Sequence, residues 1–199
     1  MNKKSRGAEI PIVYKIVFMG DSGVGKTSLA TRISCDTYNS HGDATIGASY
    51  FSKFIEKNNR KYSFNIWDTA GQEKYRCLVP LYYNNADAAI IVYDITNNIS
   101  FSEAKKRVSE LRKETSISVI LFIGNKSDLE DKRQVSMKEA TEYCEEADIL
   151  FDETSAKLDV NVNNILNNIL DKLPSQPECT DGLVSIIPPV NIDQKYCCY

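Results

Sequence analysis

A glycine-rich segment, Gly20–Thr27, constrains the fold of this chain more than any other feature of the sequence. It fits the pattern G-x-x-x-x-G-K-[ST] and follows Ile12–Met19, a run of β-branched and aromatic residues with the length of a buried strand. A helix-compatible stretch begins at Lys26 and continues to Ile33. Glycines let successive backbone N–H groups point inward, and the start of a helix adds its positive dipole end. A strand, this turn and a helix in that order predict a binding site for phosphate groups.

The residues of this segment have separable roles. We expect the Lys26 ammonium group to neutralise the β- and γ-phosphates and the Thr27 hydroxyl to coordinate Mg²⁺. The residues that we expect to contact the nucleotide here are Ser22, Gly23, Val24, Gly25, Lys26, Thr27 and Ser28. The alternative is a glycine turn that matches the pattern by chance, and the flanking strand and helix argue against it. By itself the segment indicates only a nucleoside triphosphate.

A second motif, Asn125-Lys126-Ser127-Asp128, follows a strand-like run at 119–124 and identifies the base. A carboxylate only accepts hydrogen bonds, so Asp128 can receive two, from N1–H and the exocyclic amino group of guanine. Adenine lacks both donors, and the unpaired carboxylate would discriminate against it by about 10⁴-fold or more. Ser155-Ala156-Lys157, just past the last expected strand, can add a main-chain N–H to the guanine oxygen. One such motif can arise by chance, but three in this order predict guanine.

A third motif, Asp68-Thr69-Ala70-Gly71-Gln72, predicts the chemistry at the γ-phosphate. Asp68 is expected to hold Mg²⁺ through water, Gly71 to donate its N–H to the γ-phosphate, and Gln72 to orient the attacking water. Thr45, in the loop between the first helix and the second strand, is the expected second hydroxyl ligand of Mg²⁺. Loss of the γ-phosphate removes the contacts of Thr45 and Gly71, so the loops around them are expected to relax.

The spacing of the two threonines bears on the rate of hydrolysis. Only 17 residues separate Thr27 from Thr45, which is too few for an inserted helical domain. We therefore expect no arginine finger within the chain itself. Intrinsic turnover below about 10⁻² per second is expected, with an arginine supplied by a partner for fast hydrolysis.

The hydrophobic pattern predicts an α/β fold. Strands that alternate with helices indicate a mostly parallel sheet covered on both faces. A turn at 57–60 predicts a hairpin between the second and third strands, and Ser136 with Glu139 predicts a capping box at a helix start. The expected strands are 12–19, 48–56, 61–67, 88–93, 118–123 and 149–151, and the expected helices are 26–33, 102–113, 136–147 and 162–173.

Composition defines the ends of the domain and excludes some partners. Residues 1–10 are polar and expected to be flexible, 11–173 form the predicted domain, and 174–199, with four prolines and no period, are expected to be disordered. A net charge of −3 without a basic stripe gives no reason to expect nucleic-acid binding. Six cysteines are present, none in a metal-ligand spacing with His41, so no zinc site is expected.

Beyond the nucleotide motifs, five stretches resemble signatures of the Rab family of small GTPases. They are Ile46-Gly47-Ala48-Ser49-Tyr50, Phe64-Asn65-Ile66-Trp67, Lys74-Tyr75-Arg76-Cys77-Leu78, Tyr82-Tyr83-Asn84-Asn85-Ala86 and Val92-Tyr93-Asp94-Ile95-Thr96. The resemblance covers about residues 10–173 and the C-terminus. It implies the P-loop small-GTPase fold, with a six-stranded, mostly parallel sheet that has one antiparallel strand. The wording of these stretches leans towards the early-endocytic branch of the family.

The resemblance also implies ligands, partners and roles. By it, Tyr38 stacks on the guanine ring, GTP or GDP binds with Mg²⁺, and the chain is a monomer served by an exchange factor, a GTPase-activating protein, a GDP-dissociation inhibitor and effectors. The residues that effectors would contact are Ile46, Tyr50, Trp67 and Tyr82. Simple core packing is the alternative role for the aromatic ones. Tyr50 replaces the usual Phe and Asn84-Asn85 the usual Arg-Gly, which leaves effector choice open.

The chain ends in Cys197-Cys198-Tyr199. A C-a-a-X box is excluded because Tyr196 occupies the fourth position from the end. The ending resembles the Cys-Cys-X signal of Rab proteins, which implies geranylgeranyl groups on Cys197 and Cys198 and a place on the cytoplasmic face of endosomes or vesicles. Two lipids agree with a tail that lacks a polybasic patch, since one lipid gives only marginal binding. Unmodified thiols are the alternative.

Two other functions remain open at this point. One is a nucleotide-bound scaffold that does not hydrolyse, against which Gln72, Thr27 and Thr45 argue. The other is a P-loop kinase or metabolic ATPase, which Asn125–Asp128 and the cysteine ending disfavour.

Overall fold

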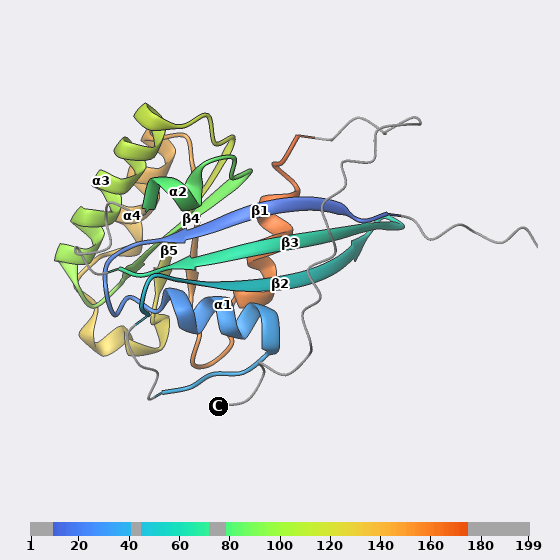
Figure 1. Ribbon diagram of the computed structural model, residues 1–199. Helices are drawn as coiled ribbons and strands as arrows, with labels where there is room; N and C mark the ends of the chain where they lie inside the picture. Colours follow the sequence, from blue (N-terminus) through green and yellow to red (C-terminus); the bar gives the residue numbers. More distant parts are fainter. Residues whose placement is uncertain (1–9, 41–44, 72–78, 175–199) are drawn as a thin grey trace, which may run out of the picture.

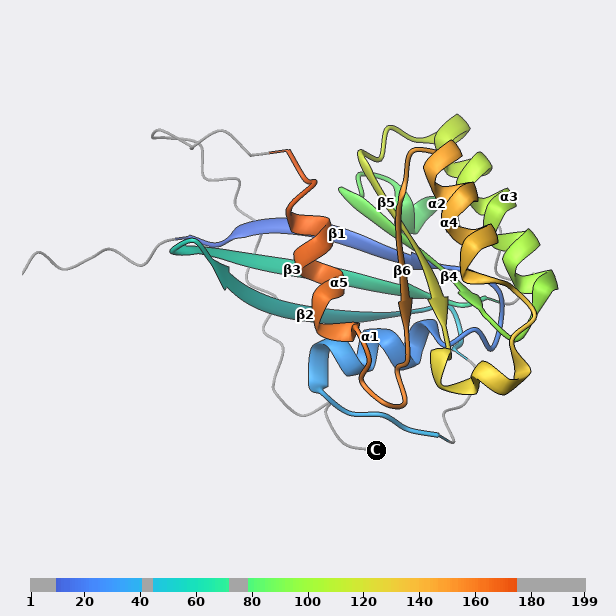
Figure 2. The same ribbon diagram turned by 180° about the vertical axis from the view of Figure 1, so that it is seen from behind.

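A computed structural model describes residues 10–40, 45–71 and 79–174. A single six-stranded sheet runs through these residues, with helices on both of its faces (Figures 1 and 2). In spatial order its strands are β2 (Ala48–Lys57), β3 (Arg60–Thr69), β1 (Ile12–Met19), β4 (Ala88–Asp94), β5 (Val119–Asn125) and β6 (Leu150–Thr154). All neighbouring strands are parallel except β2 and β3, which form the predicted hairpin. The predicted sheet is confirmed.

The helices divide between the two faces as the alternation along the strands requires. In β1, Ile16 and Phe18 pack towards α1 (Lys26–Cys35) and α5 (Ile165–Leu170). Val17 and Met19 face the other side, where α3 (Asn98–Glu114) and α4 (Met137–Glu146) lie. Figures 1 and 2 show these two helix pairs on opposite faces. Successive side chains of a strand point to opposite faces, so one strand supplies both cores.

The parallel strands bring the predicted motifs to one edge of the sheet. The glycine-rich segment follows β1, Asp68 lies at the end of β3, Asn125 ends β5, and Ser155 follows β6. The carboxyl ends of parallel strands lie along the same edge, where α/β sheets bind their ligands. This edge is where a nucleotide site has to be sought.

Several helix boundaries differ from the predicted ones. The predicted helix at 102–113 begins earlier, at Asn98, because the Asn97 side chain caps it by accepting from the N–H groups of Ile99 and Ser100. The Ser136 hydroxyl accepts from the Glu139 N–H at 3.1 Å, as the capping box predicts. The short helix α2 (Val79–Tyr83) and the 3₁₀-helix η2 (Ser127–Lys132) were not predicted.

The last helix is shorter than the predicted 162–173. A 3₁₀ turn, η3 (Val162–Asn164), precedes α5, which ends at Leu170. Asparagine is frequent in this segment, and its side-chain amide competes for backbone groups. The Asn167 amide, for example, donates to the Asn163 carbonyl at 3.4 Å. Among the described residues, no helix has the length and apolar character needed to cross a membrane.

Candidate functional site

The glycine-rich turn leaves the start of α1 open. Gly25 is the N-cap residue of α1 and has a φ of 98°, a backbone conformation that favours glycine. A Cβ atom at Gly25 would lie 2.2 Å from the Asn125 Nδ2 atom, so a larger residue does not fit without a shift. Within residues 10–40, 45–71 and 79–174, no side chain caps the first turn of α1, and its N–H groups are available to an anion.

Lys26 is buried beside this turn. Its side chain is 5 % exposed, and its Nζ atom donates to the Asp21 carbonyl at 2.7 Å. Burial lowers the pKa of Lys26 to about 8, while the nearby carboxylates of Asp68 and Asp21 act to raise it. Gly71 packs against the same group, since a Cβ atom there would lie 2.5 Å from Lys26 Nζ. A buried ammonium group held this way favours an anionic ligand such as a phosphate.

Three oxygen-bearing side chains meet next to Lys26. The Thr27 hydroxyl lies 2.7 Å from the Thr45 hydroxyl and 2.6 Å from Asp68 Oδ2. Asp68 is fully buried, and its Oδ1 atom has no hydrogen-bond partner among the residues that the structure describes. Burial raises the pKa of Asp68, which the Thr27 hydroxyl and the Lys26 charge counteract. The structure therefore brings together the three residues predicted to hold the metal.

This donor set fits a small divalent cation. One carboxylate and two hydroxyls are hard oxygen ligands, and the orphaned Asp68 Oδ1 atom is a buried acceptor that a cation or its bound water would satisfy. The described residues contain no group of three or more His, Cys, Asp or Glu side chains that could hold a metal alone. Mg²⁺ commonly uses one or two carboxylates together with phosphate oxygens and water, so the cluster suits it.

Asn125 joins the phosphate turn to the two segments predicted to bind the base, Asn125–Asp128 and Ser155–Lys157, which are called the base loops below. Its Nδ2 atom donates to the Val24 carbonyl at 2.8 Å. Its Oδ1 atom accepts from the Thr154 hydroxyl and from the Ala156 N–H, both at 3.3 Å. The buried Asn125 amide therefore connects its own motif to the glycine-rich turn and to the Ser155–Lys157 stretch.

The other residues of the base loops also lie together. The Ser155 hydroxyl donates to Asp128 Oδ1 at 2.6 Å and accepts from the Leu158 N–H at 3.1 Å. Lys126 has a left-handed φ of 68°, and its ammonium group lies 2.6 Å from Asp94 Oδ2. Asp94 thus fixes the Lys126 side chain, and Asp128 stands beside the Ser155–Lys157 stretch as predicted.

Arg32 lies between Tyr38 and the last base loop. Its Nε atom donates to the Ala156 carbonyl at 3.1 Å, and one Nη atom donates to the Lys157 carbonyl at 3.4 Å. Its guanidinium carbon lies 6.0 Å from the centre of the Tyr38 ring. Tyr38, partly exposed, is thereby placed near the base loop on which its predicted stacking role depends.

The predicted aromatic surface forms a continuous row. The Trp67 ring lies between Tyr50, at 5.4 Å between ring centres, and Tyr82, at 5.8 Å. Tyr50 donates its hydroxyl to Asn65 Oδ1 at 2.8 Å, and Ile46 nearby in the sequence is strongly exposed. These rings are only partly buried, so they offer a surface as well as packing.

Some predicted residues lie outside the described residues. They are Gln72, the Lys74–Leu78 stretch with Cys77, and the terminal Cys197 and Cys198.

Three supporting residues were not predicted from the sequence. Thr154 lies directly before Ser155, and Asp94 ends a buried strand next to β5, so both positions carried a signal at the site's edge of the sheet. Arg32 carried none, because its contacts reach more than 120 residues along the chain.

Comparisons with known proteins agree with this arrangement. The sequence model of the Ras family matches residues 15–175. Ras-related protein RHN1 of Nicotiana plumbaginifolia is 49 % identical over 165 residues, which are 82 % of this chain and 82 % of that protein. Ras-related protein Rab5 of Nicotiana tabacum is 48 % identical over 165 residues, again 82 % of each chain.

The glycines of the phosphate turn allow a direct test of the site's packing. Gly23→Ala places a methyl group in open space, so it should cost only the strain of a φ of 77°, about 1–2 kcal/mol. Gly25→Ala carries similar strain and also displaces the buried Asn125–Val24 hydrogen bond, so we expect a further loss of about 1–3 kcal/mol. Urea unfolding of both variants measures the difference. Equal stability would show that Asn125 is not held against the turn.

Proposed function

Because this chain belongs to the Ras family and, within it, to the Rab group, we propose that it is a switch that binds GTP or GDP with Mg²⁺. One observation carries the proposal. The Thr27 hydroxyl lies within 2.7 Å of both Thr45 and Asp68, beside the buried Lys26 ammonium group. An Mg²⁺-bound triphosphate would provide partners for the Lys26 ammonium group, for the Asp68 Oδ1 atom and for the N–H groups at the start of α1.

Each part of the site then has a task. The backbone N–H groups of the glycine-rich turn and the start of α1 bind phosphate oxygens, and Lys26 neutralises their charge. Thr27, Thr45 and Asp68 would hold Mg²⁺, which supplies positive charge against the phosphates when it is bound. Asp128 accepts from the guanine edge, with Asn125 holding its loop against the phosphate turn.

Hydrolysis of GTP is proposed to be slow in the isolated chain. Gln72 orients the attacking water, and a GTPase-activating protein supplies the arginine that stabilises the transition state. When the γ-phosphate leaves, Thr45 and Gly71 lose their contacts. The Ala70 N–H donates to the Gly47 carbonyl at 2.8 Å. The segments that contain Thr45 and Gly71 therefore meet and can respond together to the loss of the γ-phosphate.

The output of the switch is proposed to be read at a membrane. Effectors contact the row of Tyr50, Trp67 and Tyr82 with Ile46, which borders the Thr45 segment. Geranylgeranyl groups on Cys197 and Cys198 attach the chain to the cytoplasmic face of endosomes or vesicles, and a GDP-dissociation inhibitor extracts it as a monomer. Similarity to a protein named Rab5 supports the early-endocytic branch.

Guanine selection and Mg²⁺ dependence provide the first test. We expect GTP to bind more tightly than ATP by about 10⁴-fold or more. In the presence of Mg²⁺, Thr27→Asn should weaken GTP binding by at least about tenfold, because a cation ligand is lost. Thr141→Asn, on the exposed side of α4, is the matched control and should bind normally. Calorimetric titration measures the affinities of the wild type for GTP and ATP and of both variants for GTP. Equal affinity for ATP and GTP would favour the P-loop kinase or ATPase alternative.

The hydrolytic role of Gln72 is tested with saturating GTP. Gln72→Leu should slow partner-stimulated phosphate release by about 10²-fold or more, because the attacking water loses its orientation. GTP affinity should stay at the wild-type value. If neither wild type nor variant releases phosphate with any activating protein, the non-hydrolysing scaffold would be the better description.

The membrane anchor is tested on protein taken from its native cell. Mass spectrometry should find geranylgeranyl groups on Cys197 and Cys198, and replacing both by Ser should move the protein from membranes to the soluble fraction. Cys179→Ser, earlier in the same tail, is the control and should leave the distribution unchanged. Bare thiols at Cys197 and Cys198 would contradict this part of the proposal.

A further inference from the structure

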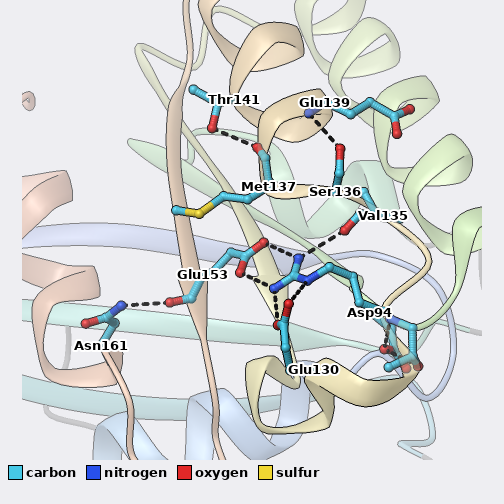
Figure 3. A network of polar contacts seen from close by, with 11 residues as sticks. Asp94, Glu130, Val135, Ser136, Met137, Glu139, Thr141, Glu153 and Asn161 are labelled. Carbon is cyan, nitrogen blue, oxygen red and sulfur yellow. Dashed lines mark hydrogen bonds and ion pairs between the residues drawn. The ribbon is translucent and has the colours of Figure 1, made fainter.

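The guanidinium group of Arg133 uses every donor that it has. An arginine side chain offers five N–H donors. Here Nε and Nη2 donate to the two Glu130 oxygens at 2.8 and 2.7 Å, and Nη1 and Nη2 donate to the two Glu153 oxygens at 2.8 Å each. The last donor goes to the Val135 carbonyl at 3.0 Å. Figure 3 shows Glu130, Glu153 and Val135 close together.

The two carboxylates lie close in sequence to the two base loops. Glu130 lies in η2, two residues after Asp128. Glu153 lies in β6, two residues before Ser155. Asp128 and Ser155 are themselves joined by a 2.6 Å hydrogen bond. Arg133 therefore forms a second connection between the same two parts of the chain, in addition to the hydrogen bond between Ser155 and Asp128.

Neighbouring contacts anchor this second connection to the sheet. The N–H groups of Gln134 and Val135 both donate to the Ile95 carbonyl, at 2.9 and 3.1 Å. On the β6 side, the Asn161 amide donates to the Glu153 carbonyl at 2.9 Å (Figure 3). The Arg133 network is thus held from both loops, and a shift of one loop would be transmitted to the other.

The two ion pairs of the network, which we call its arms, differ in burial: the arm to Glu153 is buried and the arm to Glu130 is exposed. The Arg133 and Glu153 side chains are 17 % and 10 % exposed, whereas the Glu130 side chain is 67 % exposed. A buried ion pair is a poor source of stability compared with apolar packing, and its best-attested use is to fix one geometry. An exposed pair stabilises a fold little. The network is therefore better suited to fix the relative positions of the two base loops than to stabilise the fold.

We propose that Arg133 is a positioning residue for guanine recognition, holding the loop of Asp128 in register with the Ser155–Lys157 loop through Glu130 and Glu153. This inference rests on the proposed function. Lysine could not replace it, since an ammonium group has three donors and no planar fork for two carboxylates. The loop geometry that Arg133 fixes determines how well the guanine amino group is read.

The test compares two nucleotides that differ only at the base edge. Inosine diphosphate keeps N1–H but lacks the amino group of GDP. We expect wild type to release it faster than GDP. Arg133→Gln should bring the two dissociation rates closer, lowering their ratio by about threefold or more, because a displaced Asp128 loses more with GDP. Arg133→Lys should not restore the ratio.

A second variant keeps the test independent of folding. Glu130→Ala removes only the exposed arm, so its melting temperature should stay near the wild-type value. The ratio should nevertheless fall, which a purely structural role of the network does not predict. Arg112→Gln is the matched control. Its guanidinium group joins α3 to the Ala147 and Asp148 carbonyls, away from the base loops, so the ratio should be unchanged.

The outcomes separate the inference from its premise. If Arg133→Gln and Glu130→Ala both keep the wild-type ratio, whatever their melting temperatures, the positioning role is wrong. The same holds if Arg112→Gln lowers the ratio as much as Arg133→Gln does. If wild type itself binds adenine and guanine nucleotides equally, the proposed function fails instead.

Discussion

The buried amide of Asn125 is the interaction on which the rest of the site depends. It donates to the phosphate turn at Val24 and accepts from Thr154, the last residue of β6, and from Ala156 just beyond that strand. Asn125 is only 3 % exposed, so water cannot replace any of these hydrogen bonds if it is lost. One residue therefore sets the distance between the part of the site that would bind phosphates and the part that would read a base. Gly25 has to be glycine for the same reason, because its neighbour is this amide.

Around that fixed point, the site holds charges that the fold alone does not need. Lys26 is buried with a lowered pKa, and Asp68 is buried with a raised pKa and has one oxygen without a partner in the described part of the chain. Such groups are unfavourable in a protein interior unless they find counter-charges. Their proximity to an open helix start favours a ligand that carries negative charge and a cation at once. In the proposed switch, the Mg²⁺-bound nucleotide is that ligand.

The sequence predicted the sheet, and it predicted a set of proposed site residues that the structure brings together, because both depend on short-range signals. The run of β-branched and aromatic residues in β1 and the motifs at the ends of β1, β3 and β5 are local signals, and parallel strands place their ends together without further information. Asn97 and the asparagines near α5 shifted helix boundaries through side-chain contacts that a pattern of apolar residues does not contain. The Arg133 network was not predicted, since the partners Arg133 and Glu153 are 20 residues apart and meet only in the folded chain.

The two halves of the site differ in how firmly they are held. The base loops are joined by Ser155 to Asp128, by Arg133, and by the ion pair of Lys126 with Asp94. On the phosphate side, Thr45 is bonded to the Thr27 hydroxyl, a group that Mg²⁺ is proposed to engage. A nucleotide that keeps its base but loses one phosphate would leave the first half as it is and remove contacts only from the second. In the proposed switch, that asymmetry would allow the protein to keep its nucleotide while the loop that contains Thr45 changes conformation.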